Sequence, residues 1–213
     1  GLYSGLEAKL DDLSFALDVV SKRASERIAR FAFSLAHREK RARVTIIHKA
    51  TVLKLSGGLF RQICFDVARD FREIKTDELM VDTAAYKLVT NPREFHVLLT
   101  TNIFGDILSD VGAGVTGGLG LAPSANIGEK YALFEPVHGT GSEIVGRGTA
   151  NPLAAIFSAT MLLHHLGETL AARKLESAAE NVLQAGQIVT PDIGGRSSTV
   201  AMTNEISRLL RES

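Results

Sequence analysis

The chain has 213 residues, long enough for one large domain or two small ones, and 45% of them are apolar. Its 24 basic side chains balance its 24 acidic ones, which argues against a nucleic-acid-binding protein or one that binds anionic membranes. The single cysteine, Cys64, excludes an internal disulfide and a cysteine-based metal cluster, and it favours a reducing compartment: the cytoplasm, with an organelle matrix also open.

Helical and strand-like patterns alternate along the first half of the chain. Amphipathic periodicity predicts helices over residues 21–40, 58–71 and 84–92 and from residue 102 onward. Apolar and β-branched runs predict strands over residues 43–50, 78–83 and 95–101. This alternation predicts an α/β architecture with a parallel or mixed sheet.

The second half of the chain is short of strand patterns. Residues 117–128 are rich in Gly and Pro without either periodicity, which predicts a linker or a switch loop. One strand is predicted over 131–137, and three helices over 151–168, 169–186 and 200–212. Because one strand cannot form a sheet, we expect this half to take partner strands from sequence outside this chain or from another chain.

Two aspartates, Asp106 and Asp110, stand one helical turn apart in an apolar run without lysine or arginine. Their charges repel, and a solvated helix face is the plain alternative. Asp82 also follows a predicted strand, and ligands of α/β proteins bind beyond the carboxyl ends of strands. Three carboxylates gathered there would suit Mg²⁺ or Mn²⁺, which prefer oxygen ligands.

Lys49 ends another predicted strand, in the stretch TIIHKAT. Beside a divalent cation the neutral amine is favoured, which suits a general base; the alternative is a surface lysine at a strand end. Residues 135–152 form a glycine-rich stretch between a strand and a helix. Its backbone N–H groups suit phosphate, or it is an ordinary loop, and it matches neither the dinucleotide fingerprint nor the Walker pattern.

Six motifs resemble those of the metal-dependent β-decarboxylating dehydrogenases, which act on isocitrate, homoisocitrate, 3-isopropylmalate and tartrate. They occur in family order between Gly1 and about Leu210: HKAT, NIFGDILSD, GGLGLAPSANIG, EPVHGT, TANP and TPDIGG. The resemblance implies an isocitrate/isopropylmalate dehydrogenase-like two-domain α/β fold. Residues 1–116 would form the small domain for dimerisation, metal and catalysis, and residues 117–213 the C-terminal half of the large, cofactor-binding domain.

The resemblance also implies that the large domain is incomplete in this chain. In the family, upstream sequence supplies the first strands of the large domain and an arginine cluster that binds the substrate carboxylates. Neither is found in this sequence. We therefore expect the chain to be the C-terminal part of a longer enzyme or one partner of a split one, and not active alone.

The resemblance assigns a role to each candidate residue. Asp106 and Asp110, joined by Asp82 of the partner subunit, would bind Mg²⁺ or Mn²⁺. Lys49 would take the substrate's hydroxyl proton, and Tyr3, by itself only a turn aromatic, would protonate the enolate left by loss of CO₂. The residues on the cofactor side would be His138, Gly139, Thr140, Glu143, Asn151 and Asp192.

The implied cofactor is NAD, because Glu143 lies where NAD-preferring members carry an acid. A carboxylate there accepts hydrogen bonds from the ribose hydroxyls and repels the 2′-phosphate of NADP, an effect that Arg147 would partly offset. The stretch around Asp106 is more similar to the isocitrate and homoisocitrate branch of the family than to bacterial 3-isopropylmalate enzymes. The expected substrate is therefore isocitrate or homoisocitrate, and 3-isopropylmalate is the next candidate.

The expected function is NAD- and Mg²⁺- or Mn²⁺-dependent oxidative decarboxylation of a 2-hydroxy-3-carboxy acid by a homodimer with shared active sites. One alternative is a non-catalytic regulatory or assembly subunit of such an enzyme, and another is an unrelated α/β domain with solvated acids. The proposed catalytic and metal-binding side chains are all intact, which favours catalysis.

Overall fold

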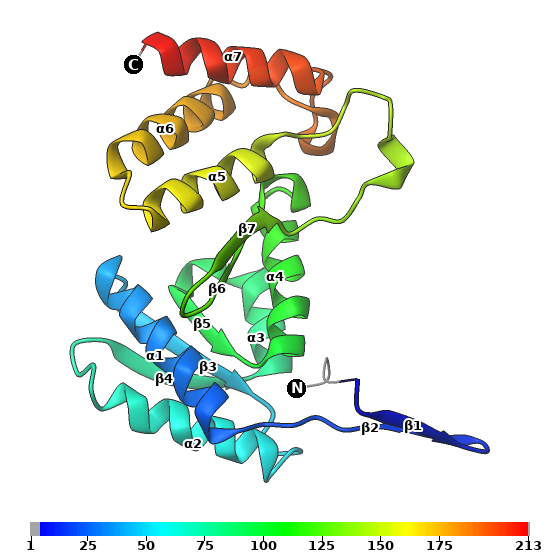
Figure 1. The fold of residues 1–213 in the computed structure, drawn as a ribbon, viewed down its shortest axis with the longest axis vertical. Coiled ribbons are helices and arrows are strands. Elements are labelled where there is room, and N and C mark those ends of the chain that lie inside the picture. The colour runs from blue at the N-terminus through cyan, green and yellow to red at the C-terminus, as the bar shows by residue number, and fades with distance from the viewer. Residues whose placement is uncertain (1–4, 213) are drawn as a thin grey trace. The chain divides into compact units, whose positions relative to one another are not determined.

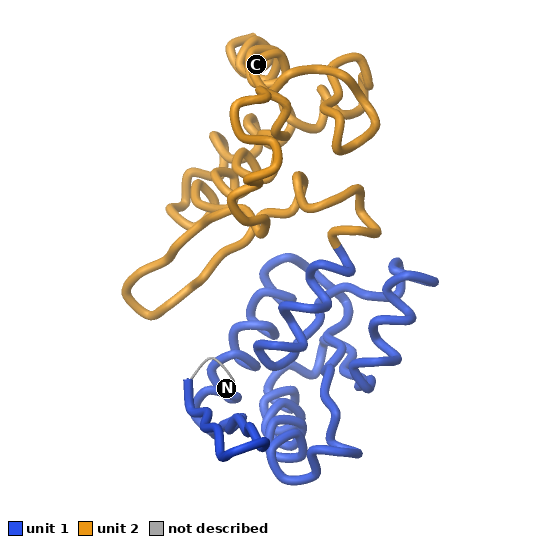
Figure 2. The backbone as a smooth tube through the Cα atoms, turned by 90° about the vertical axis from the view of Figure 1, so that its right-hand side faces the viewer, with its two compact units in different colours: residues 1–112 blue, residues 113–213 orange. Residues whose placement is uncertain are grey.

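The structure, a computed structural model, describes residues 5–212, and the chain divides into two compact units, Gly1–Gly112 and Ala113–Ser213 (Figure 2). Each unit has buried hydrophobic clusters of its own. The combination of helices and sheets confirms the predicted α/β class. Whether residues 1–116 and 117–213 are the small and large domains of a complete enzyme stays a prediction.

A three-stranded parallel sheet in the order β4-β3-β5 is the centre of the first unit (Figure 1). Its strands are β3 (Arg43–His48), β4 (Lys75–Met80) and β5 (Val97–Thr100). The central strand, β3, is buried from its second residue to its last. A strand covered on both faces needs apolar residues that point to both sides, and Val44, Ile46 and Ile47 supply them.

Helices cover both faces of this sheet, since successive side chains of a strand point to opposite sides. The helices that begin in the first unit are α1 (Lys22–Arg38), α2 (Ser56–Ala68), α3 (Val81–Thr90) and α4 (Asn102–Thr116). Val44 and Ile46 pack with buried residues of α1 and α2. Ile47 packs on the other side, with buried residues of α3 and α4. A short 3₁₀ helix, η2 (Pro92–Glu94), leads from α3 toward β5.

The first helix starts where its sequence provides a cap, and it buries a face made of small residues together with Phe33. The Ser21 side chain accepts a hydrogen bond from the Ala24 N–H at 3.2 Å, which satisfies a free donor at the start of α1. Ile28 and Phe31 of this helix are 42% and 39% exposed. The helix buries its alanine-rich side instead, because small residues let it approach the sheet closely.

An antiparallel hairpin precedes this sheet. It is formed by β1 (Glu7–Leu10) and β2 (Leu13–Ala16), and all eight strand residues are exposed (Figure 1). The register places Leu10 opposite Leu13 and Ala8 opposite Phe15, so one face is apolar. A lone two-stranded hairpin is marginally stable in water, so this one needs a covering surface.

The second unit packs three helices and a two-stranded antiparallel sheet. Its main elements are η3 (Leu119–Leu121), β6 (Pro123–Ile127), β7 (Ala132–Pro136), η4 (Ser142–Ile144), α5 (Leu153–His165), α6 (Thr169–Ala185), η5 (Pro191–Ile193) and α7 (Thr199–Glu212). Its core centres on Leu153, Val182 and Met202, one from each helix. The helices were predicted within a few residues, whereas β6 corrects the prediction of a strandless linker over 117–128.

One further difference from the sequence prediction concerns the strand before Asp82. The strand predicted over residues 78–83 ends at Met80, and Asp82 belongs to the first turn of α3 instead. Cys64 lies on the buried side of α2. Among residues 5–212, no helix combines the length and apolar character needed to cross a membrane.

Candidate functional site

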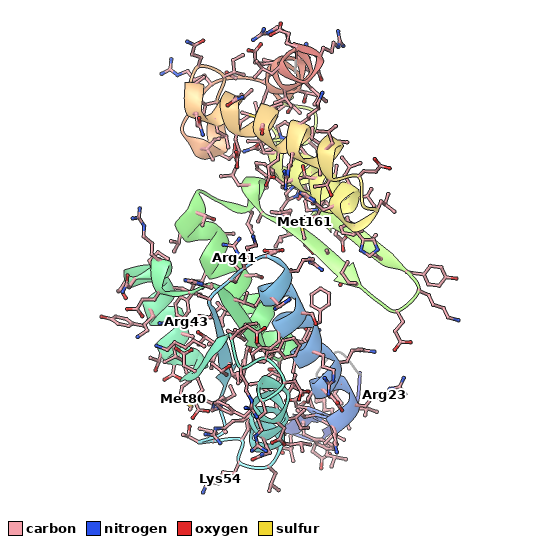
Figure 3. All side chains as sticks on the ribbon, turned by 90° about the vertical axis from the view of Figure 1, so that its left-hand side faces the viewer. Arg23, Arg41, Arg43, Lys54, Met80 and Met161 are labelled. Atoms are coloured by element: carbon pink, nitrogen blue, oxygen red, sulfur yellow. The ribbon has the colours of Figure 1, made fainter. Side chains whose placement is uncertain are left out.

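The candidate catalytic residues of the first unit lie at the carboxyl edge of its parallel sheet. In Figure 3, Met80, the last residue of β4, and Lys54, in the turn after β3, lie toward one end of the sheet, while Arg43, which starts β3, lies toward the other. Lys49 directly follows β3, and Asp82 directly follows the junction of β4 with α3. Because β3 and β4 are parallel neighbours, the two side chains meet at this edge.

Lys49 and Asp82 form an ion pair. The Lys49 ammonium donates to the Asp82 carboxylate at 2.5 Å. This hydrogen bond lowers the pKa of the Asp82 carboxyl below its usual range, and the backbone N–H groups of Asp82 and Thr83 at the start of α3 act in the same direction. The Asp82 carboxylate is therefore ionised at neutral pH, and its side chain remains 65% exposed.

The other two candidate metal ligands, Asp106 and Asp110, lie one turn apart on α4 and are both exposed. Their helix contains no basic residue, and within the described residues neither carboxylate has a hydrogen-bond or ion-pair partner. Two such oxygen donors fit a hard divalent cation. Residues 5–212 of one chain contain no cluster of three or more His, Cys, Asp or Glu able to hold a metal. The third ligand, Asp82 of the partner subunit, therefore stays a prediction.

The candidate cofactor residues occupy the long segment between β7 and α5 in the second unit (Figure 1). His138, Gly139, Thr140 and Glu143 are all exposed there. The His138 ring donates through Nδ1 to the Gly139 carbonyl at 2.9 Å, which orients the ring. The Glu143 side chain is exposed to solvent in this segment, and its part in binding a cofactor stays a prediction.

The far end of this segment is anchored to the start of α7. The Thr199 N–H donates to the Gly148 carbonyl at 2.9 Å, and the Thr199 hydroxyl donates to the Ala150 carbonyl at 2.5 Å. These bonds hold the backbone immediately before Asn151. The segment thus reaches α5 in a defined conformation while its exposed part, which carries Glu143, stays open to solvent.

Asn151 and Asp192, two predicted cofactor residues far apart in sequence, are brought together. The Asn151 amide Nδ2 donates to Asp192 Oδ2 at 3.0 Å, while Asn151 Oδ1 accepts from the N–H of Leu153, the first residue of α5. Gly120 lies against this pair: a Cβ there would overlap the Asp192 carboxylate and lie 2.9 Å from the Asn151 Cβ. Glycine at position 120 is thus required for this close approach.

Comparisons with known proteins agree with the fold. The profile of the family described as isocitrate/isopropylmalate dehydrogenase matches residues 1–208. The chain belongs to this family. Its backbone superposes on the crystal structure of isocitrate dehydrogenase from Methylococcus capsulatus with a TM-score of 0.95 at 44% identity, covering 99% of this chain and 64% of that one.

Curated relatives carry several substrate names. The 3-isopropylmalate dehydrogenase of Archaeoglobus fulgidus is 50% identical over 98% of this chain and 64% of its own length. The isocitrate/homoisocitrate dehydrogenase of Thermus thermophilus is 48% identical over 99% of this chain and 63% of its own length. The chain thus spans less than two thirds of these family members, and the identities do not separate the substrates.

Sequence reasoning missed one group of side chains beside Lys49. His48, which ends β3, is buried and contacts Glu78 of β4, which in turn contacts Arg61 of α2. A histidine at the end of a buried strand was the available signal, but Glu78 is 30 positions from His48 and 17 from Arg61, so only the fold reveals the group. Tyr3 lies outside the described residues, so its role as a proton donor stays a prediction.

Proposed function

We propose that the complete protein is an NAD-dependent, Mg²⁺- or Mn²⁺-dependent dehydrogenase that oxidatively decarboxylates a 2-hydroxy-3-carboxy acid. The observation that supports this most is the Lys49–Asp82 ion pair at the carboxyl edge of the sheet in a member of this family. It joins a proton acceptor to a metal ligand, the two functions that the reaction needs in one place.

In the proposed reaction, the C–H hydride of the hydroxyl-bearing carbon goes to the nicotinamide while the hydroxyl proton goes to Lys49. The resulting keto acid releases its 3-carboxylate as CO₂, and a proton completes the product. Bound Mg²⁺ or Mn²⁺, held by Asp106, Asp110 and the partner's Asp82, would polarise the hydroxyl and stabilise the enolate charge.

The proposed cofactor site uses the exposed segment around Glu143 together with the Asn151–Asp192 pair. Glu143 would accept hydrogen bonds from the ribose hydroxyls, and its charge would disfavour a 2′-phosphate. Two relatives named as isocitrate dehydrogenase [NAD] subunit alpha, from Drosophila melanogaster and Bos taurus, are 42% identical to the chain, which supports NAD as the proposed cofactor.

A homodimer is part of this proposal. The hairpin β1–β2 exposes an apolar face that includes Leu10, Leu13 and Phe15, and Asp106 and Asp110 lack a third metal ligand among residues 5–212 of their own chain. A twofold dimer would cover the apolar hairpin face, and the same symmetry operation would bring the third metal ligand from the partner subunit.

The direct test is turnover by the protein in its complete natural form. Purified protein is given Mn²⁺ and NAD with isocitrate, homoisocitrate or 3-isopropylmalate, and NADH formation and CO₂ release are followed together. We expect equal yields of both products from at least one of these acids, with isocitrate or homoisocitrate leading. Chelation by EDTA should abolish both signals, and excess Mn²⁺ should restore them.

Lys49→Met and Asp82→Asn are the informative variants, with Lys54→Met as the matched control, because Lys54 is an exposed lysine of the same turn without a role in the proposal. We expect Lys49→Met and Asp82→Asn to lose activity and Lys54→Met to keep it. Activity that survives Lys49→Met would contradict the role of Lys49 as proton acceptor, whereas a wild-type protein that binds these acids without turnover would favour the non-catalytic subunit.

A further inference from the structure

A buried histidine that the proposed reaction does not use stands next to Lys49. His48 is 1% exposed and ends β3, the central strand of the sheet. Burying an imidazole is unfavourable unless both ring nitrogens find partners. Both ring nitrogens have partners here. One is the backbone N–H of Ala50, next to Lys49, and the other is Glu78, which forms an ion pair with Arg61.

The hydrogen bonds of the ring define its tautomer. The Ala50 N–H points at Nδ1 over 3.1 Å, so Nδ1 must accept and carries no proton. Nε2 then carries the proton and donates it to Glu78 Oε2 at 3.0 Å. The acceptor role of Nδ1 thus depends on Glu78, which keeps the ring proton on the other nitrogen.

Glu78 is itself held in place by Arg61. The guanidinium donates from Nε to Oε2 at 2.5 Å and from Nη2 to Oε1 at 2.8 Å, a two-point contact that fixes the plane of the carboxylate. These bonds, and secondarily the one from His48, lower the pKa of the Glu78 carboxyl below its usual range. Glu78 is therefore a permanent acceptor for the ring proton at neutral pH.

The backbone around Lys49 is fixed on both sides by these contacts. Its carbonyl accepts from the N–H groups of Val52 and Leu53 at 3.0 and 2.8 Å, forming a tight turn. The next N–H, that of Ala50, is held by the His48 ring, and the Ala50 backbone is packed against Gly57 of α2. The Lys49 side chain leaves this turn toward Asp82.

We propose that Arg61, Glu78 and His48 form a positioning chain, in which the oriented His48 ring holds the Ala50 amide and thereby aims Lys49 at Asp82. This inference rests on the proposed function, in which Lys49 accepts the substrate's hydroxyl proton. The three side chains do not contact substrate in this arrangement. They act through Lys49, so their removal should lower kcat and leave KM nearly unchanged.

Two substitutions at His48 separate the two ring contacts. The amide oxygen of Asn is as many bonds from the backbone as Nδ1, so His48→Asn keeps an acceptor for the Ala50 N–H. The amide of Gln reaches the position of Nε2, so His48→Gln keeps a donor for Glu78 and loses the acceptor. In the complete protein, we expect His48→Asn to keep kcat within about threefold and His48→Gln to lower it by about 10- to 100-fold.

The role of Glu78 is tested by the same substitution in the wild-type protein and in the His48→Asn variant. Glu78→Gln should lower kcat when His48 is present, because the Arg61 contact weakens and the ring proton is no longer fixed. It should have no further effect in the His48→Asn variant, which has no ring to orient. Equal losses of kcat in His48→Asn and His48→Gln, or a KM rise that accounts for the whole effect, would overturn the proposal.

A spectroscopic readout does not depend on turnover. The ¹⁵N shifts of His48 in the wild-type protein should show Nε2 protonated and Nδ1 unprotonated, and the ¹³C shift of the Asp82 carboxyl should move in His48→Gln but not in His48→Asn. The opposite tautomer, or an Asp82 signal indifferent to both variants, would refute the positioning chain even in an active enzyme. Normal spectra in a protein that turns over none of the acids would refute the proposed function alone.

Discussion

At Glu143 a single exposed carboxylate is expected to set the choice between two cofactors. The 2′-phosphate of NADP would stand near this charge, and the ribose hydroxyls of NAD would donate to it. We predict that Glu143→Lys lowers the ratio of kcat/KM for NAD to that for NADP by at least about tenfold, a difference of about 1.4 kcal/mol. Steady-state kinetics with both cofactors measures this ratio.

The matched control for that variant is Glu180→Lys, the same charge change at an exposed position of α6. It should leave the ratio unaltered. If the Glu143 and Glu180 variants behave alike, Glu143 does not face the ribose and the NAD assignment loses its physical basis.

Gly120 is a steric rather than an electrostatic determinant. A methyl group there would overlap the Asp192 carboxylate, so Gly120→Ala must displace Asp192 and break its bond to Asn151. A hydrogen bond of this kind contributes about 1 kcal/mol, so we predict that the dissociation constant for NAD rises by roughly fivefold. Titration of NAD by fluorescence or calorimetry measures the change.

Gly58→Ala is the control for Gly120→Ala, because a Cβ at Gly58 meets nothing within 4 Å and the position is helical. It should leave NAD binding unchanged and raise the free energy of unfolding by about 0.5–1 kcal/mol. Unchanged NAD affinity in Gly120→Ala would mean that the Asn151–Asp192 pair does not shape the cofactor site.

The sequence predicted which site residues meet where those residues follow the ends of neighbouring strands. Lys49 and Asp82 each follow a strand, and parallel neighbours deliver their ends to one edge, so their meeting follows from topology. The pairing of Asn151 with Asp192 agreed with a common role but could not be derived from spacing. Glu78 gave no signal because a carboxylate in a half-buried strand is typical of a solvated edge, and its contacts with Arg61 and His48 exist only in the folded chain.

At the scale of elements, the hairpin β1–β2 has an exposed apolar face that no other described element covers. Phe15 is 45% exposed on the apolar face, while Ser14 points to the opposite, polar face of the same strand. We predict that Phe15→Glu shifts the protein from dimer to monomer by placing a charge in the interface, whereas Ser14→Glu leaves the dimer intact. Sedimentation equilibrium of both variants at equal concentration distinguishes them. A dimer that tolerates Phe15→Glu would exclude the apolar hairpin face from the interface.

The elements that sequence patterns predicted well are those whose burial is periodic. The strand β3 and the helices α2, α6 and α7 each carry the apolar repeat that their period requires. The strand β6 was missed because PSANI is short, starts with proline and lies between glycine-rich stretches, and it is a strand only because β7 pairs with it. On α1 the periodicity did not reveal which face packs: Phe31 stays partly exposed, while Phe33 and the alanines pack against the sheet.

At the scale of the whole molecule, the proposed active site divides its residues between two copies of the chain. Lys49 and Asp82 are paired within one copy, while Asp106 and Asp110 lie on a helix whose chain offers them no third acidic ligand among residues 5–212. Each active site would then take its lysine and one aspartate from one subunit and two aspartates from the other. This arrangement makes catalysis a property of the dimer, so it can be tested by mixing inactive subunits.

Mixing Lys49→Ala with Asp110→Asn subunits in the complete protein should restore activity that neither variant has alone. In a mixed dimer both defects fall in one site and the other site is intact, so random pairing should recover about 25% of wild-type kcat per subunit. Mixing Asp106→Asn with Asp110→Asn is the control: these residues serve the same site from the same chain, so every mixed site keeps one defect and no activity should return. Mixed dimers verified by native mass spectrometry that stay inactive in the first mixture would place all of these side chains in one subunit's own site.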